Sequence, residues 1–409
     1  MPSKYSQSPI IQFRDCRLLY KHEIVREDLW VRDGIILDPE KLFYEEKAYA
    51  DIQYNCNGRL IAPGFIDVQI NGCFGVDFSS NTENVEAGLQ KVAQGLLEHG
   101  VTSFCPTVIT SSQEIYKKIL PKIKKTIGSK KGAGILGVHL EGPFISKEKN
   151  GAHPVNLIKS YDQNGFQDVL NIYQNLEDVA IVTLAPELSK SADVIRELRK
   201  RNIVVSVGHS MGNLSDAETA TTHGSTFITH LFNAMLPFHH RDPGIVGLLT
   251  SSKIPENSRI FYGMISDGIH THPAALRIAH RAHPDGIVLI TDAMAAMGLS
   301  PGCHNLGSQV VEINGNSAHL AGTTTLAGSI ATMQKCVKHF KLASGCSTVE
   351  ALEGASLHPA QLLEIEQRKG TLDYNTDADF VFLDDDLNVH ATYIAGELVW
   401  PRQTSHSMA

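Results

Sequence analysis

The sequence predicts an α/β fold, a (β/α)₈ TIM barrel with a small β-sandwich domain built from both termini. Two observations lead to this prediction. The middle of the chain alternates apolar, β-branched runs with amphipathic helical segments, the pattern of repeated βα units around a parallel sheet. Both ends of the chain instead contain short apolar runs separated by turn residues, which is typical of small antiparallel strands.

The strand-rich ends flank the long middle segment. The amino-terminal end contains IIQFRDCRLLY, EDLWVRDGIILD and ADIQYNCNGRLIA, and the carboxyl-terminal end contains ADFVFLDDDLNVHATYIAGELVW at 378–400. We expect these two ends to combine into one domain. The predicted boundaries are 1–60 and 358–409 for the small domain and 61–357 for the barrel.

The middle segment contains eight apolar runs, which is the number of strands in a (β/α)₈ barrel. They span residues 61–70, 101–109, 134–142, 179–187, 202–210, 225–233, 260–268 and 286–294. Helix candidates between them include TENVEAGLQKVAQGLLEHG and SADVIRELRKRN. A doubly wound open sheet is the alternative, but no glycine-rich dinucleotide-binding turn follows the first run.

Composition narrows the functional classes. The chain has 409 residues and a net charge of −8, whereas a nucleic-acid-binding surface needs a basic stripe. Its seven cysteines include no Cys-x-x-Cys pair, so neither a zinc knuckle nor a disulfide framework is indicated. There is no apolar signal core and no run of ~20 apolar residues. We therefore expect a cytoplasmic protein that engages neither nucleic acid nor membranes.

Polar side chains end several of the predicted strands. In a (β/α)₈ barrel, the carboxyl ends of the strands carry the reactive groups. A single histidine at such a position is more often a buried core residue, but joint placement at one face of a barrel favours a site. The three histidines and two acids at the ends of strands three, five, six and eight are His139, Glu141, His209, His230 and Asp292.

Glu141, His209 and His230 together predict a site for one divalent metal ion per subunit. Catalytic zinc typically has three nitrogen or oxygen ligands and leaves one position open for water. Zinc is favoured, and cobalt, nickel or iron would also suit these ligands. His139 lies on the same strand face as Glu141, so it is either a fourth ligand or a supporting partner. We favour support, because a closed four-ligand site would exclude water.

Asp292 lies in LITDAM, on the eighth predicted strand. From there its carboxylate would face the metal across the barrel mouth, where it can take a proton from water and return it to a leaving group. The structural alternative is an N-cap for the segment AMAAMG that follows. We predict the catalytic role.

The motifs in order along the chain carry a family resemblance. They are HLEGPF (139–144), GAHP (151–154), VGHS (207–210), THLFNAM (229–235), SDGIH (266–270) and TDAM (291–294). This combination resembles the N-acetylglucosamine-6-phosphate deacetylase family of the amidohydrolase superfamily, over roughly residues 10 to 400. RLIAPGFIDVQINGCFG and GTLDYNTDADFVFLD fit the resemblance but occur more widely among amidohydrolases.

The resemblance implies a metal-dependent amidohydrolase barrel that removes the acetyl group of N-acetylglucosamine 6-phosphate. It makes Glu141, His209 and His230 the metal ligands and Asp292 the general base and acid. It also implies a homodimer in which Arg241 comes from the neighbouring subunit. The residues implied to contact the substrate are Ala152 and His153 for the sugar and amide carbonyl, Asn233 and Ala234 for main-chain donation, Arg241 and His270 for the phosphate, and the loop Leu326, Ala327 and Gly328 over the acetamide.

The segment PFHHRDPG (237–244) is a local basic cluster in an acidic chain. Arginine presents a planar fork to phosphate oxygens, and neighbouring histidines can add charge or hydrogen bonds. On sequence alone, a solvated loop explains the segment equally well. The family resemblance favours phosphate binding.

Gln69 and Asn71 end the first predicted strand, where two-metal relatives carry His-x-His. Amide oxygens are poor ligands for zinc-like ions compared with imidazole. We therefore expect a one-metal active site. These amides could instead hydrogen-bond the nucleophilic water or shape the mouth of the barrel.

Two other functions compete with deacetylation. A cyclic-amide hydrolase would usually need His-x-His and a carboxylated lysine bridging two metals, and no lysine ends the third or fourth strand. A catalytically silent sugar-phosphate-binding protein would suit the missing His-x-His. Retention of Asp292 together with all three candidate ligands argues against it.

Overall fold

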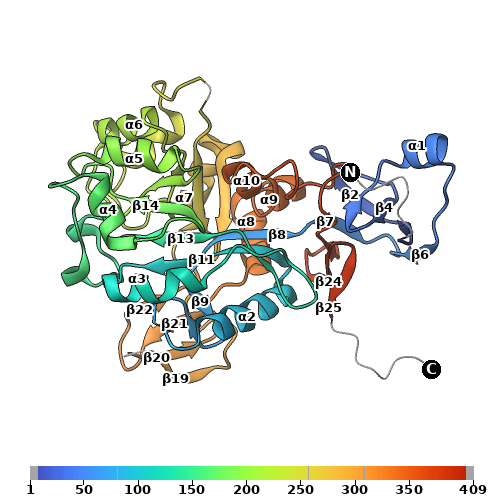
Figure 1. Ribbon diagram of the computed structural model, residues 1–409, viewed down its shortest axis with the longest axis horizontal. Helices are drawn as coiled ribbons and strands as arrows, with labels where there is room; N and C mark the ends of the chain where they lie inside the picture. Colours follow the sequence, from blue (N-terminus) through green and yellow to red (C-terminus); the bar gives the residue numbers. More distant parts are fainter. Residues whose placement is uncertain (1–7, 81, 257, 307–308, 402–409) are drawn as a thin grey trace.

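The computed structural model describes residues 8–80, 82–256, 258–306 and 309–401. Within these ranges the predicted barrel is confirmed: eight parallel strands follow one another around a central core, with helices outside (Figure 1). In order they are β8 (Phe65–Ile70), β11 (Val101–Ile109), β13 (Val138–Glu141), β14 (Val179–Leu184), β15 (Val204–Val207), β16 (Phe227–Ile228), β17 (Phe261–Ile265) and β18 (Ile287–Ile290). A short strand, β12 (Gly134–Ile135), pairs with β11 as well.

The barrel strands are buried on both faces, which explains their nearly continuous apolar sequences. Several end earlier than the sequence predicts. The run 225–233, for example, yields only β16, because the chain leaves the sheet in turns from Thr229 onward. His209, His230 and Asp292 therefore lie two residues beyond the ends of their strands, whereas Glu141 is the last residue of β13.

Hydrogen bonds near the carboxyl ends of β8 and β18 close the barrel. The Thr291 hydroxyl donates to the Asp67 carboxylate at 2.6 Å. The Asp292 N–H donates to the Gln69 carbonyl at 2.9 Å, and the Asn71 N–H donates to the Ala293 carbonyl at 2.8 Å. This seam brings the first strand against the last.

Amphipathic helices cover the outside of the barrel. In α5, for example, Val194, Ile195 and Leu198 form the buried stripe, while the charged residues face solvent. None of the helices in the described ranges is long and apolar enough to cross a bilayer. The helices are α2 (Val85–Leu96), α3 (Gln113–Ile119), α4 (Phe166–Tyr173), α5 (Ser191–Arg199), α6 (Leu214–Thr222), α7 (Pro273–Ala282), α8 (Met333–Ser344), α9 (Thr348–Glu353) and α10 (Leu357–Leu362).

Strands from both chain ends form two further sheets beside the barrel, at the right of Figure 1. Leu60–Pro63 (β7) pairs with Phe380–Leu383 (β23), so the two ends meet in one ladder. One sheet is β5 (Ile35–Ile36), β4 (Leu29–Arg32), β1 (Ile11–Arg14) and β6 (Ile52–Asn55); the other is β25 (Glu397–Trp400), β24 (Val389–Ile394), β23, β7, β2 (Arg17–Tyr20) and β3 (Glu23–Val25).

We propose the domain division 1–60 with 358–409 against 61–357. The first boundary lies at β7, whose ladder with β23 carries the terminal sheet as far as Pro63. The second boundary lies at the start of helix α10, which packs against the barrel strands β8 and β18.

An antiparallel sheet follows the last barrel strand, at the bottom of Figure 1. The segment Leu326–Gly328, which was expected to be a short loop, is its edge strand β22 and pairs with β21. The other strands are β19 (Gly302–Leu306), β20 (Gln309–Asn314) and β21 (Ser317–Leu320). A two-stranded hairpin, β9 (Gly72–Cys73) and β10 (Val76–Asp77), follows β8.

Asp67 makes the stability of the seam depend on pH. Burial raises the pKa of its carboxyl to about 7, although Thr291 donates hydrogen bonds to it. Between about pH 4 and pH 7 the folded chain therefore holds a proton that the unfolded chain has released. We expect the free energy of unfolding to fall by roughly 2 kcal/mol from about pH 5 to pH 7 through this group.

Urea unfolding of the parent and of Asp67→Asn at several pH values measures this contribution. The variant should lack that part of the pH slope. Asp385→Asn, in which an 85% exposed side chain is changed, is the control. Identical slopes in the parent and Asp67→Asn would remove Asp67 as the cause.

Candidate metal centre and active site

Three ligand atoms meet at the carboxyl end of the barrel. Glu141 Oε1 lies 2.9 Å from His209 Nε2 and 3.1 Å from His230 Nε2, and the two imidazole nitrogens are 3.0 Å apart. All three residues are buried. They come from β13 and from the turns after β15 and β16. One carboxylate oxygen and two imidazole nitrogens in such a triangle are a suitable ligand set for a divalent metal ion.

The backbone is strained where the site side chains begin. His209, His230 and Asp292 have φ angles of +48°, +27° and +45°. A residue other than glycine held there costs on the order of 1 to 3 kcal/mol, and such residues cluster at functional sites. Each of the three lies two residues after the end of a barrel strand, so the strain lies where the chain leaves the sheet.

The far side of His209 sets its tautomer. Its Nδ1 lies 2.8 Å from the Lys149 carbonyl oxygen, which can only accept, so Nδ1 carries the hydrogen. Its Nε2 lone pair then faces Glu141, as a metal ligand requires. Burial would raise the pKa of Glu141, but the imidazoles of His209 and His230 beside it outweigh burial and hold the pKa well below its usual range.

His230 also lies beside the Glu141 carboxylate. Burial would lower the pKa of its imidazole, but the Glu141 carboxylate outweighs burial and raises it to about 8. Its Nδ1 is buried and has no hydrogen-bond partner among the described residues. Two imidazole nitrogens in contact beside one carboxylate are well suited to share a cation. These residues therefore fit a bound metal ion.

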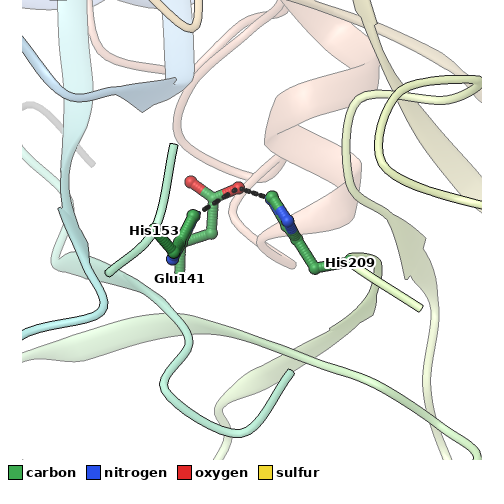
Figure 2. Close-up of side chains that lie close together, drawn as sticks. All are labelled: Glu141, His153 and His209. Carbon is green, nitrogen blue, oxygen red and sulfur yellow. Dashed lines mark hydrogen bonds and ion pairs between the residues drawn. The ribbon is translucent and has the colours of Figure 1, made fainter. Parts of the chain in front are cut away.

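His153 also faces the cluster (Figure 2). Its Nε2 lies 4.0 Å from Glu141 Oε1, farther than His209 or His230. The Thr110 N–H donates to Nδ1 at 3.3 Å, so the ring hydrogen is on Nε2. Burial lowers the pKa of His153 to about 3. Although Glu141, His153 and His209 are close enough to form a trio of ligands, His153 offers a neutral N–H toward the site instead of a lone pair.

His139 is not a fourth ligand. Its Nδ1 lies 3.0 Å from the Val68 carbonyl oxygen and its Nε2 lies 2.7 Å from the Thr183 hydroxyl, so both ring nitrogens are engaged. His139 can support the site only indirectly, through Thr183. The Thr183 hydroxyl lies 2.7 Å from the Thr229 hydroxyl, and Thr229 directly precedes His230.

Two side-chain amides hold Asp292. Asn71 Nδ2 donates to Asp292 Oδ1 at 2.8 Å, and Gln69 Nε2 donates to the same oxygen at 3.4 Å. Burial and the charge of Glu141 raise the pKa of Asp292 to about 6. No helix begins at the described residues directly after Asp292, so the N-cap alternative is wrong.

Gln69 and Asn71 thus act as hydrogen-bond donors to the carboxylate. Their carbonyl oxygens, Gln69 Oε1 and Asn71 Oδ1, are buried and have no partner among the described residues. Buried polar atoms without partners are rare and call for an explanation at a functional site. Here the two amides position Asp292.

The main-chain donors expected after the sixth strand differ from each other. The Asn233 N–H already donates to the His230 carbonyl at 2.9 Å, so it is not free for a substrate. The Ala234 N–H has no hydrogen-bond partner within the described ranges. Ala152 is exposed beside the buried His153.

His270 and Arg241 have different surroundings. Asp267 Oδ2 lies 2.5 Å from His270 Nδ1 and orients the ring. Burial would raise the pKa of Asp267, but His270 outweighs burial and lowers it. Arg241 is exposed, and its Nε lies 3.3 Å from Nε2 of the neighbouring His240. Its phosphate role remains a prediction.

The expected acetamide segment lies beside the strand end that carries Asp292. The Met294 N–H donates to the Ser329 carbonyl at 2.9 Å. A Cβ added to Gly328 would lie 3.4 Å from the Met294 side chain. Leu326 and Ala327 precede this contact in β22 and are half-buried.

Sequence reasoning missed two supporting residues. Thr110 fixes the tautomer of His153, and Asp267 orients His270. The sequence did carry a signal for Asp267, because this acid lies at the end of a predicted strand, three residues before His270. Thr110 carried no signal of its own, since its partner lies 43 positions away.

Comparison with known proteins places this geometry in a family. The family model described as "Amidohydrolase family" matches residues 60–399. The N-acetylglucosamine-6-phosphate deacetylase of Bos taurus is 63% identical over 395 residues, covering 97% of both chains. The protein of the same name from Danio rerio is 60% identical over 402 residues, covering 98% of this chain and all of the other.

Solved structures agree. The N-acetylglucosamine-6-phosphate deacetylase of Pasteurella multocida has a TM-score of 0.81 and 27% identity, covering 95% of this chain and 99% of its own. A mutant of the Mycobacterium smegmatis enzyme, in complex with N-acetyl-D-glucosamine-6-phosphate, has a TM-score of 0.78 and 30% identity, covering 96% of this chain and 100% of its own. The chain therefore belongs to the amidohydrolase family, among relatives named N-acetylglucosamine-6-phosphate deacetylases.

Proposed function

We propose that this protein hydrolyses the N-acetyl group of N-acetyl-D-glucosamine 6-phosphate to give D-glucosamine 6-phosphate and acetate, in amino-sugar breakdown or recycling. The observation that carries the proposal is the triangle of Glu141, His209 and His230 in the same barrel mouth as a carboxylate held by two amides. Relatives of this name match nearly the whole chain.

Glu141, His209 and His230 would hold one divalent metal ion in each active site, with zinc proposed and cobalt, nickel or iron as alternatives. Such an ion supplies Lewis acidity toward an amide carbonyl and a water molecule. The three side chains supply one negative charge and two neutral nitrogens, provided that the imidazoles are unprotonated. The Lys149 carbonyl accepts the Nδ1 hydrogen of His209, so the Nε2 lone pair of the neutral ring faces the site.

Asp292 moves the proton. A carboxyl with a pKa of about 6 accepts and releases a proton near neutral pH, as a general base and acid must. Asn71 and Gln69 both bind Oδ1, which leaves Oδ2 available for that exchange. Asp292 takes the proton of the attacking water and returns it to the amine nitrogen that leaves.

His153 stabilises the negative charge that develops on the amide oxygen. Its neutral ring presents Nε2–H toward the cluster, and Thr110 prevents the ring from reversing its tautomer. A fixed donor in a buried site stabilises the transition state more than the ground state.

The remaining assignments concern substrate binding. Arg241 and His270 bind the phosphate, with Arg241 reaching the active site of the neighbouring subunit in a homodimer. Asp267 supports this use of His270, because it orients the ring. Ala152 contacts the sugar, Ala234 donates its main-chain N–H, and Leu326, Ala327 and Gly328 cover the acetamide. We propose a cytoplasmic location.

Acetate release by metal-loaded protein tests the function. We expect release from N-acetylglucosamine 6-phosphate and little from N-acetylglucosamine, because the unphosphorylated sugar cannot engage Arg241 and His270. Equal release from both sugars would keep the hydrolase but contradict the phosphate assignment. No release from a protein that binds the phosphorylated sugar would contradict the proposed function and favour a silent binding protein.

Asp292→Asn tests the proton transfer. The amide keeps the size of the side chain but cannot take up the proton, so kcat should fall by roughly 10² to 10⁴-fold. Metal content should match the parent, because Asp292 is not one of the proposed ligands. Asp193→Asn, at an exposed position, is the control. Normal turnover in Asp292→Asn would remove Asp292 from this role.

The double variant Gln69→His/Asn71→His tests why the active site takes one metal ion. Imidazoles at these positions would supply the two missing ligands, so the variant should bind one more ion per chain than the parent. Metal analysis after removal of free ions measures the difference. An unchanged metal content would show that these two side chains do not set the number of ions.

A further inference from the structure

A second group of metal-ligating side chains lies outside the barrel strands. His280 is near the end of α7, Cys346 lies between α8 and α9, and Glu350 is in α9. One nitrogen, one sulfur and one oxygen atom from these residues all lie within 4.8 Å of one another. They meet because α7 packs against α8, and α9 follows α8 after a short turn.

This group lies at the opposite end of the barrel from Glu141. Helix α7 runs back from the carboxyl end of β17 toward the start of β18, and His280 is close to its last turn. In (β/α)₈ barrels that end supports stability, while the chemistry occurs at the other end. A ligand bound here would therefore act on the scaffold and not on the reaction.

His280 has an unused ring nitrogen. The residue is 8% exposed, and its Nε2 is buried and has no hydrogen-bond partner among the described residues. Glu350 Oε1 lies 3.4 Å from this nitrogen, at ion-pair distance but without hydrogen-bond geometry. The Phe340 ring packs edge-on against the imidazole, with the two ring centroids 5.4 Å apart, and restricts the rotation of the imidazole. A buried nitrogen in this state lacks the partner that such atoms normally have.

Glu350 presents one free oxygen to His280. Its Oε2 accepts the Ser347 N–H at 2.7 Å, as part of the capping box that begins α9. Burial would raise the pKa of Glu350, but the Ser347 hydrogen bonds and His280 outweigh burial and lower it. The carboxylate is therefore ionised at neutral pH, and its Oε1 faces the ring.

The spacing suits a tetrahedral metal ion. Zinc bonds to nitrogen, oxygen and sulfur in a tetrahedron place ligand atoms roughly 3.3 to 3.7 Å apart. The His280–Glu350 separation of 3.4 Å is already in this range. All three ligand atoms lie within 4.8 Å of one another, so the Cys346 sulfur has to move by roughly 1 Å, which a change of its χ1 angle provides.

We infer that His280, Cys346 and Glu350 bind a transition-metal ion of the zinc class, separate from the active-site ion. A nitrogen, sulfur and oxygen set selects such ions over magnesium or calcium. Partial burial raises the pKa of the Cys346 thiol, so binding releases its proton. The ion would link α7 to α9 through its ligands and stabilise the folded chain by mass action.

Cobalt(II) tests the inference, because a cobalt–thiolate bond produces a charge-transfer band in the near ultraviolet. None of the proposed active-site ligands is a thiolate, so the band reports only on the second site. We expect the band on titrating the metal-loaded full chain with cobalt. Cys346→Ser should abolish the band and lower the bound metal by one ion per chain. Cys303→Ser, at an exposed cysteine, should keep both.

Glu350→Gln is the second variant, in case Cys346→Ser does not fold. Glutamine preserves the capping box, so α9 should form, while the lost charge should weaken cobalt binding at this site. No band in the parent, or a band that survives in Cys346→Ser, would overturn the inference and leave an ordinary ion pair. Acetate release is measured on the same samples, so a failure of the proposed function is recognised separately.

Discussion

The hydrogen-bonded seam between β8 and β18 is the constraint on which the site depends. It joins residues more than 220 positions apart and closes the barrel, so it fixes the distance from the first strand to the last. The same seam carries the amides of Gln69 and Asn71 to the carboxylate of Asp292. The contacts that close the barrel therefore also place the Asp292 carboxylate. A slip of one residue would turn these side chains to the opposite face.

Burial alone would raise the pKa of both acids of the site, Glu141 and Asp292, but their neighbours differ, and so do the resulting pKa values. The two histidines keep the pKa of Glu141 low and its carboxylate ionised. Burial and the charge of Glu141 raise the pKa of Asp292 to about 6, although Asn71 donates a hydrogen bond to it. Different environments thus give one carboxylate the properties of a ligand and another those of an acid–base group.

The histidines of the barrel show the same principle through their tautomers. The Lys149 carbonyl accepts a hydrogen bond from His209 Nδ1, so the Nε2 lone pair faces the site, whereas the Thr110 N–H donates to His153 Nδ1, so Nε2–H faces the site. Both ring nitrogens of His139 contact barrel-strand residues, Val68 and Thr183. Three imidazoles from the same region therefore have three uses, and a neighbour outside the metal triangle decides each use.

The sequence by itself determined the barrel and the positions of Glu141, His209, His230 and Asp292, because apolar periodicity marks strands and polar residues at their ends stand out. It did not reveal β19–β22, whose first strand is largely exposed and lacks an apolar pattern. Only the tertiary structure decided that Gln69 and Asn71 hold Asp292, that the Asn233 N–H is engaged, and that His280 approaches Glu350. Those facts depend on side-chain contacts between distant segments and on local turn geometry, and neither leaves a periodic signal in the chain.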